Sequence, residues 1–179
     1  MSDWFETLDG TYAKVWECLT VSANNRAQVA VATIGPNVTP EVRTVVLRHA
    51  SAPEIEIYTD LQSDKITSLQ ANPIASILLW DADLALQIRL TTKVSILSGD
   101  AVMDRWKAVP DHSKISYGIT PAPGEPIPDS TAYTKQPDPN VFAVLACDVT
   151  HIDAVYLGTT HRRAAFSQDS DWRGKWLAP

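Results

Sequence analysis

The spacing of apolar residues changes along the chain from a helical to a strand-like pattern. Between Trp4 and Leu19 apolar side chains recur every three or four residues, which predicts an amphipathic helix that Gly10 can split. After the polar turn at residues 22–26, the apolar residues form the short runs and alternations typical of β-strands. The expected strands cover residues 28–33, 41–50, 54–58, 74–81, 84–97, 142–149, 151–157 and 162–167. The first three of these predict a meander.

Two further helices are expected between the strands. Ser63 can cap a short helix over residues 63–71, which Asn72-Pro73 ends. A second helix is expected over residues 100–109. Strands in runs with few helices between them favour a mainly β fold, an antiparallel barrel with α additions, over alternating βαβ units.

A length of 179 residues favours a single domain. We expect this domain to span residues 1–179, with an N-terminal helical segment at residues 1–22 and a Pro-rich loop at residues 119–140. The loop contains half of the chain's 12 prolines, so it can hold little regular structure. A loop of this length in a compact domain predicts that it covers a site or crosses a subunit interface.

Charge and composition exclude several classes of function. The net charge of −6 disfavours nucleic acid and anionic membranes as partners. Cys18 and Cys147 lie in apolar surroundings, which predicts buried free thiols in a reducing compartment. With no signal-peptide pattern and no apolar run long enough to span a membrane, we expect a cytoplasmic protein. The four histidines are scattered singly, so we assign no metal site.

The residues between positions 43 and 89 carry the candidate chemistry. A phosphate ester needs cations, hydroxyl donors and, where possible, a helix N-terminus. Arg43, Ser63, Lys65 and the first turn of the predicted helix can supply all three. The pair Tyr58-Thr59 offers main-chain groups to a planar heterocycle, and Gln87 offers an amide. Taken singly, each of these polar residues is more simply read as a solvent-facing side chain.

Their joint order resembles the pyridoxamine 5'-phosphate oxidase-like flavoprotein family. The family pattern is Arg-x-Val-Leu-Leu-Lys, then Tyr-Thr, then Ser-Arg-Lys, then Asn-Pro, then Gln-Val-Arg. The matching segments here are Arg43-Thr44-Val45-Val46-Leu47-Arg48, Tyr58-Thr59, Ser63-Asp64-Lys65, Asn72-Pro73 and Gln87-Ile88-Arg89. Arg162-Arg163, Trp172 and the terminal Leu177-Ala178-Pro179 resemble the family's closing Arg, Trp and Leu-x-Pro.

This resemblance implies an FMN-binding split barrel that forms a homodimer, with FMN lying across the two-fold interface. Arg43 and Lys65 would hold the FMN phosphate, assisted by Ser63. The remaining cofactor contacts that the resemblance implies are Thr44, Val45, Tyr58, Thr59, Gln87 and Arg162. Whether Arg162 or Arg163 faces the flavin depends on a one-residue choice of alignment.

The departures from the family pattern bear on the substrate. Asp64 replaces a basic phosphate ligand, and Gly158 and Thr160 stand where the biosynthetic oxidases have Arg and His. We therefore expect an FMN-dependent oxidoreductase acting on a small organic substrate other than pyridoxamine phosphate, with Arg48 and Arg163 as candidate substrate contacts. The alternatives are a non-catalytic FMN carrier or sensor, or a family member that uses a deazaflavin or haem.

Overall fold

The N-terminal helical segment is divided in two by Thr7. The computed structural model describes residues 3–179, so Met1 and Ser2 of the expected segment lie outside the described residues. A short 3-10 helix, η1 (Trp4–Glu6), precedes α1 (Leu8–Asn24). The expected break at Gly10 is wrong, because Thr7 is extended and its hydroxyl accepts the N–H of Gly10 at 3.0 Å, capping α1. Gly10 instead permits close packing, since a Cβ there would lie 2.5 Å from the carbonyl oxygen of Trp4.

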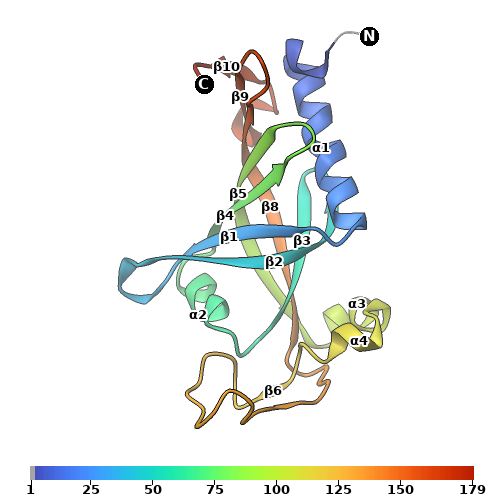
Figure 1. Ribbon diagram of the computed structural model, residues 1–179, viewed down its shortest axis with the longest axis vertical. Coiled ribbons are helices and arrows are strands. Elements are labelled where there is room, and N and C mark those ends of the chain that lie inside the picture. The colour runs from blue at the N-terminus through green and yellow to red at the C-terminus, as the bar shows by residue number, and fades with distance from the viewer. Residues whose placement is uncertain (1–2) are drawn as a thin grey trace.

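Six antiparallel strands close into a barrel (Figure 1). Their order around the barrel is β8-β3-β2-β1-β4-β5, and β5 pairs with β8 to complete the ring. The barrel strands are β1 (Gln28–Ile34), β2 (Pro40–Ser51), β3 (Glu54–Asp60), β4 (Ile74–Asp81), β5 (Leu86–Ser98) and β8 (Phe142–Tyr156). Two further strands, β9 (Arg162–Ser167) and β10 (Lys175–Leu177), extend the sheet beyond β8. The predicted mainly β barrel with α additions is confirmed, including its first meander.

Strand β8 is continuous where the sequence predicted two strands, at residues 142–149 and 151–157. The register opposite it shifts, with Thr91 pairing His151 and Thr92 pairing Val149. Thr150 is therefore the extra residue of a β-bulge, and its hydroxyl donates to the carbonyl oxygen of Thr91 at 3.2 Å. The bulge lets one long strand bend around the barrel without ending.

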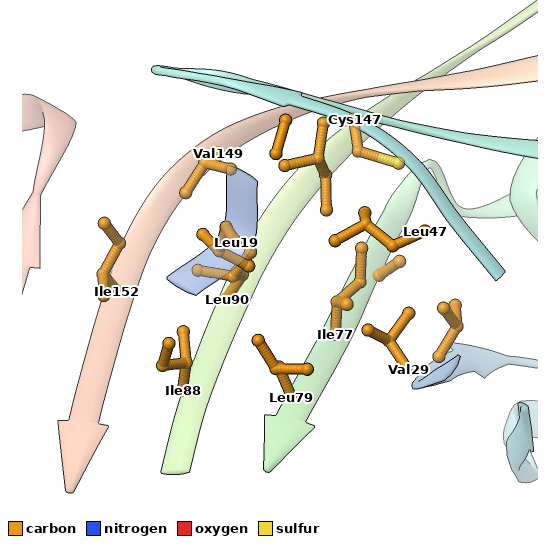
Figure 2. Packing of buried hydrophobic residues seen from close by; sticks show 14 of the residues in the cluster. Leu19, Val29, Leu47, Ile77, Leu79, Ile88, Leu90, Cys147, Val149 and Ile152 are labelled. Carbon is orange, nitrogen blue, oxygen red and sulfur yellow. The ribbon is translucent and has the colours of Figure 1, made fainter. Parts of the chain in front are cut away.

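Apolar side chains that alternate along the strands fill the barrel (Figure 2). Ile88 and Leu90 of β5 point inward with Leu47 of β2, and each is at most 1% exposed. Helix α1 contributes Leu19 to the same buried cluster as Leu90. Both cysteines are buried and free, as predicted, and burial raises the pKa of the Cys18 thiol to about 11.

The remaining elements gather at the end of the barrel nearest α2 (Figure 1). They are η2 (Pro36–Val38), α2 (Asp64–Ala71), η3 (Gly99–Val102), α3 (Met103–Ala108) and α4 (Asp111–Lys114), with η4 (Gln168–Ser170) apart from them near β9. The Pro-rich loop holds a two-stranded ribbon, β6 (Ile119–Thr120) and β7 (Thr134–Lys135). The N–H of Gly118 donates to Asp60 Oδ2 at 2.9 Å and fixes the start of the loop to β3. Within residues 3–179, no helix is both long and apolar enough to cross a membrane.

Candidate functional site

A cavity of about 330 Å³ opens where β2, β3, the start of α2 and the Pro-rich loop meet. The strand ends supply polar main-chain and side-chain groups, and Ile119 and Pro123 of the loop form an apolar wall. The residues predicted from the sequence that line it are Thr44, Val45, Arg48, Tyr58, Thr59, Ser63 and Lys65. The fold therefore brings seven of the eleven candidate residues together from three separate elements.

The ammonium group of Lys65 lies at one end of this cavity without a carboxylate partner in the described part of the chain. It donates to Thr59 Oγ1 at 3.0 Å and to Ser63 Oγ at 2.9 Å. Burial lowers the pKa of Lys65, and the positive charge of Arg43 lowers it further. A desolvated cation held only by neutral hydroxyls is well placed to take a negatively charged ligand.

Ser63 occupies the N-cap position of α2, as predicted, but its side chain does not cap the helix. Its hydroxyl donates to the carbonyl oxygen of Asp60 at 2.7 Å instead. The backbone N–H groups in the first turn of α2 therefore donate no hydrogen bond to the Ser63 side chain. Such a helix start, beside the half-buried ammonium group of Lys65, favours a bound anion.

Arg43 lies close to this region but is already paired. Its guanidinium donates to Glu41 Oε2 at 2.8 Å and to Thr33 Oγ1 at 2.6 Å. Glu41 also accepts from the hydroxyl of Ser68 in α2, at 3.0 Å. Arg43 does not line the cavity, although its charge acts on the pKa of Lys65. Of the two cations expected to bind the phosphate, Arg43 forms an ion pair with Glu41, whereas Lys65 forms none within residues 3–179.

Arg48 is a second cationic residue that lines the cavity. Its Nη2 lies 3.5 Å from the hydroxyl of Tyr117, and its guanidinium carbon lies 5.5 Å from the ring centre of Tyr58. Burial raises the pKa of Tyr117, so its hydroxyl stays protonated and able to donate at neutral pH. Tyr117 was not among the site residues expected from the sequence. Its position two residues before a loop expected to cover a site was the signal that could have found it.

The other four candidates lie outside this cavity within one chain. Gln87 pairs with Val155, and Val155 pairs with Arg163, so Gln87 and Arg163 share the outer face of the barrel. Arg162 pairs with Tyr156 and therefore points to the opposite face. There it lines a small hollow beside aromatic residues of η1, away from Gln87.

Arg163 is held in an ion-pair network on that outer face. Its Nε and Nη2 donate to the two carboxylate oxygens of Asp153 at 3.0 and 2.8 Å, and Arg89 donates to the same carboxylate. Burial alone would raise the pKa of Asp153, but the hydrogen bonds and charges of Arg163 and Arg89 outweigh it and lower that pKa. Asp153 is thus ionised at neutral pH and neutralises part of this cationic cluster.

A row of directly paired residues, one from each neighbouring strand, connects the cavity with the region around Gln87 and Asp153. Thr44 of the cavity pairs with Ala30, Ala30 with Leu78, and Leu78 with Arg89, which pairs with Asp153. Directly paired residues point to the same side of a sheet. The cavity and the Gln87 region therefore lie on one continuous surface of the barrel.

The outer face of the barrel that carries the cavity and the Gln87 region exposes several large apolar side chains. Val42 is 72% exposed and Trp80 51% exposed, and Ile34, Ile74 and Leu78 are each more than a third exposed. Clustered apolar side chains on an outer sheet face are typical of a surface that another molecule covers.

The family model described as "Pyridoxamine 5'-phosphate oxidase, FMN-binding domain" matches residues 1–98, more than half of the chain. The chain therefore belongs to this family of FMN-binding domains. A pyridoxine/pyridoxamine 5'-phosphate oxidase 2 from Arabidopsis thaliana is 27% identical over 176 residues, covering 86% of this chain and 88% of that protein. A pyridoxine/pyridoxamine 5'-phosphate oxidase from Mannheimia succiniciproducens is 29% identical over 99 residues, 55% of this chain. The match spans only 47% of that bacterial relative.

Solved structures share the fold along most of the chain. A pyridoxamine 5'-phosphate oxidase-related FMN-binding protein from Nostoc punctiforme superposes with a TM-score of 0.75 at 24% identity, over 100% of this chain and 99% of that one. An F420 reductase superposes with a TM-score of 0.51 at 14% identity, over 74% and 93% of the two chains. A heme-binding protein from Mycobacterium smegmatis superposes with a TM-score of 0.53 at 16% identity, over 83% of this chain and 56% of that one. At these identities the likeness establishes the split-barrel fold alone.

Proposed function

We propose that the cavity holds FMN, with the FMN phosphate bound by Lys65, Ser63, Thr59 and the first turn of α2. The observation that carries this proposal is the half-buried ammonium group of Lys65, which donates to hydroxyls and forms no ion pair among the described residues. Burying an unpaired cation is costly, and a dianionic phosphate offsets that cost. Membership of an FMN-binding family supports the same ligand.

The rest of the cofactor would extend along β2 and β3. Thr44, Val45, Tyr58 and Thr59 line the cavity and offer main-chain groups to a planar ring. Arg43 would act at longer range, because Glu41 already holds its guanidinium. When bound, FMN supplies the redox chemistry through its isoalloxazine ring. The chain's own residues then bind and orient the cofactor and shield it from water.

We propose that the functional unit is a homodimer in which a second copy completes this site. Gln87 lies on the same outer face as the cavity but cannot reach it within one chain, and that face exposes Val42 and Trp80. A two-fold arrangement would cover the apolar surface and bring Gln87 of the second copy over the flavin. Because Arg163 shares the strand row of Gln87, we propose Arg163 rather than Arg162 as the accompanying contact.

The proposed activity is oxidation or reduction of a small organic substrate. Arg48 forms no ion pair within residues 3–179 and lies beside the hydroxyl of Tyr117, so these two side chains are the proposed substrate contacts. Arg163 is less available to a substrate, since Asp153 holds it. Ile119 and Pro123 place the Pro-rich loop where it can exclude water. We further propose a cytoplasmic location, in keeping with two buried free thiols.

A different cofactor is the second candidate, and a specific residue favours it. Asp64 places a carboxylate at the first position of α2, where the family pattern has a basic residue, and it lies close to Gly124 of the loop. A Cβ at Gly124 would lie 3.2 Å from Asp64 Oδ2. An acidic group there opposes a phosphate, and proteins of this fold include an F420 reductase and a heme-binding protein.

An absorbance spectrum of the purified protein before and after addition of FMN tests the cofactor. The proposal predicts flavin bands that stay with the protein through gel filtration. A protein that retains no FMN but retains F420 or haem would favour the second candidate. With FMN bound, photoreduction followed by stopped-flow reoxidation with candidate acceptors tests turnover, and Arg48→Gln is expected to slow substrate-dependent reoxidation without releasing FMN. A flavin that no substrate reoxidises faster than buffer alone would indicate a carrier or sensor.

A further inference from the structure

Three charged side chains, Arg89 of β5, Asp153 of β8 and Arg163 of β9, form a cluster on the outer face of the barrel. Arg89 and Asp153 are direct partners across β5 and β8, and their neighbours Leu90 and Ile152 are buried in the core. Because side chains alternate along a strand, Arg89 and Asp153 point outward. We name the three charged side chains the Asp153 cluster.

Hydrogen bonds to Asp153 fix the direction of Arg163. Its Nε and Nη2 donate to the two carboxylate oxygens at 3.0 and 2.8 Å, and Nη2 of Arg89 donates to Oδ2 of the same carboxylate. A two-point contact of this kind sets the plane of a guanidinium group. Within residues 3–179, Nη1 of neither arginine makes a hydrogen bond. The Asp153 cluster therefore leaves donors on both arginines for a molecule that covers this face.

Asp153 also sets the charge of the cluster. Its lowered pKa keeps it ionised at neutral pH, so two guanidinium groups and one carboxylate leave one net positive charge. Arg173 and Lys175 line the same hollow of about 590 Å³ as Arg89 and Asp153, and Asp153 is the acidic side chain among the described residues that line it. Removal of this one carboxylate therefore leaves positive charge alone on this part of the face.

Within one chain, no member of the Asp153 cluster lines the cavity proposed for FMN. The cluster does lie on the face that the proposed homodimer covers, beside Gln87. On the neighbouring strand β4, Leu78 pairs with Arg89 and Trp80 pairs with Gln87, and both apolar side chains are exposed. A second copy that covers these side chains also removes water from the cluster. Charges interact more strongly where water is excluded, so the cluster then acts on the flavin of the second copy.

We propose that Asp153 is a positioning residue that sets the redox potential of the flavin held by the other copy, by orienting Arg163 and leaving one net positive charge in the cluster. The inference rests on the proposed homodimer and FMN site. Reduced flavin carries negative charge on its pyrimidine ring at neutral pH, so positive charge nearby favours the reduced form. Asp153 opposes this effect and holds the potential below the value that the two arginines alone would give.

A reductive titration of the FMN-loaded full chain, with dithionite and a reference dye, measures the midpoint potential from the flavin absorbance. Asp153→Asn should increase the preference for reduced over oxidised FMN about tenfold, which is about 30 mV for a two-electron couple. Asp153→Glu keeps the charge and should stay near the wild type. Arg89→Gln removes a positive charge and should shift the potential in the opposite direction. The control Glu17→Gln removes a carboxylate that pairs with Lys14 on α1 and should leave the potential unchanged.

Two results would overturn this inference alone, in a wild type that is dimeric and loaded with FMN. One is equal potentials in Asp153→Asn and Glu17→Gln. The other is a shift of Asp153→Asn and Arg89→Gln in the same direction, which indicates a disturbed fold rather than an effect of charge. Should Asp153→Asn fail to fold, the sign of the Arg89→Gln shift decides. A wild type that binds no FMN, or binds it as a monomer in gel filtration, would overturn the proposed site or homodimer and this inference with it.

Discussion

Two cationic regions of this barrel differ in whether a carboxylate pairs directly with the cation. Around Asp153 two arginines meet one acidic side chain and form a closed network. Around Lys65 the ammonium group meets hydroxyls alone, and burial lowers its pKa. The first arrangement stabilises the protein as it stands, whereas the second is complete only when an anion binds. Counting basic residues would not have separated the two regions.

Arg43 shows the same distinction within the proposed FMN site. The family resemblance implies that Arg43 and Lys65 both hold the phosphate, but Glu41 already pairs with Arg43 through an ion pair of 2.8 Å. The difference between an open and a paired cation can therefore be tested on two residues of one site.

Replacing Lys65 with Ala should cause the largest change in FMN affinity. The variant loses one charge-assisted contact to the phosphate, which corresponds to about 1.5–3 kcal/mol of binding free energy. Fluorescence quenching of FMN on titration with protein measures the change. Lys93→Ala, which alters an exposed lysine of β5 outside the cavity, is the control. Equal affinities for both variants would mean that the phosphate does not contact Lys65.

Replacing Asp153 with Asn should affect stability rather than phosphate binding. The variant leaves Arg89 and Arg163 without their carboxylate, which should lower the free energy of unfolding by about 1–2 kcal/mol at pH 7. The pKa of Asp153 is lowered in the folded state, so this stability is present above the ordinary aspartate pKa and is lost as the pH falls through the lowered value. Urea unfolding at pH 7 and at a series of pH values below the ordinary aspartate pKa should show the difference between the two proteins shrinking as the pH falls. A constant difference at all of these pH values would contradict the network.

Replacing Glu41 with Gln should have the smallest effect, and in the opposite direction. The change removes the carboxylate that neutralises Arg43, so the guanidinium charge of Arg43 attracts the phosphate more strongly. FMN should therefore bind more tightly by about 0.5–1 kcal/mol. The same fluorescence titration measures it. The double variant Glu41→Gln/Arg43→Gln is the control and should lose the gain. Weaker FMN binding in Glu41→Gln would indicate that the ion pair positions Arg43 for the phosphate.

Periodicity was sufficient to predict most of the fold. The strand ranges and the α2 helix follow from alternation and from Asn72-Pro73, because these signals are local. The division of β8 was wrong because a bulge at Thr150 depends on pairing with Thr91, which lies far away in sequence. The break of the first helix at Thr7 depends on a capping hydrogen bond that hydrophobic spacing does not reveal.

The candidate site was predictable only where its residues are joined by short connections. The segments around Thr44, Tyr58 and Lys65 lie on consecutive elements, so their order along the chain anticipated one cavity. The register of β8 and β9 decides that Arg163 faces Asp153 on the outer side of the sheet and that Arg162 faces the other side. A one-residue shift of that register would exchange the faces of the two arginines. The pairing of Arg43 with Glu41 likewise depends on side-chain placement that the family pattern does not specify.

Comparing FMN with riboflavin, which lacks the phosphate, tests the central claim most directly. Each ligand would be titrated into the wild type and into Lys65→Ala. If Lys65 binds the phosphate, the wild type binds FMN much more tightly than riboflavin, and Lys65→Ala reduces this preference by at least about tenfold, with little change in riboflavin affinity. An unchanged preference in Lys65→Ala, or no preference in the wild type, would contradict a phosphate site at Lys65 and the start of α2.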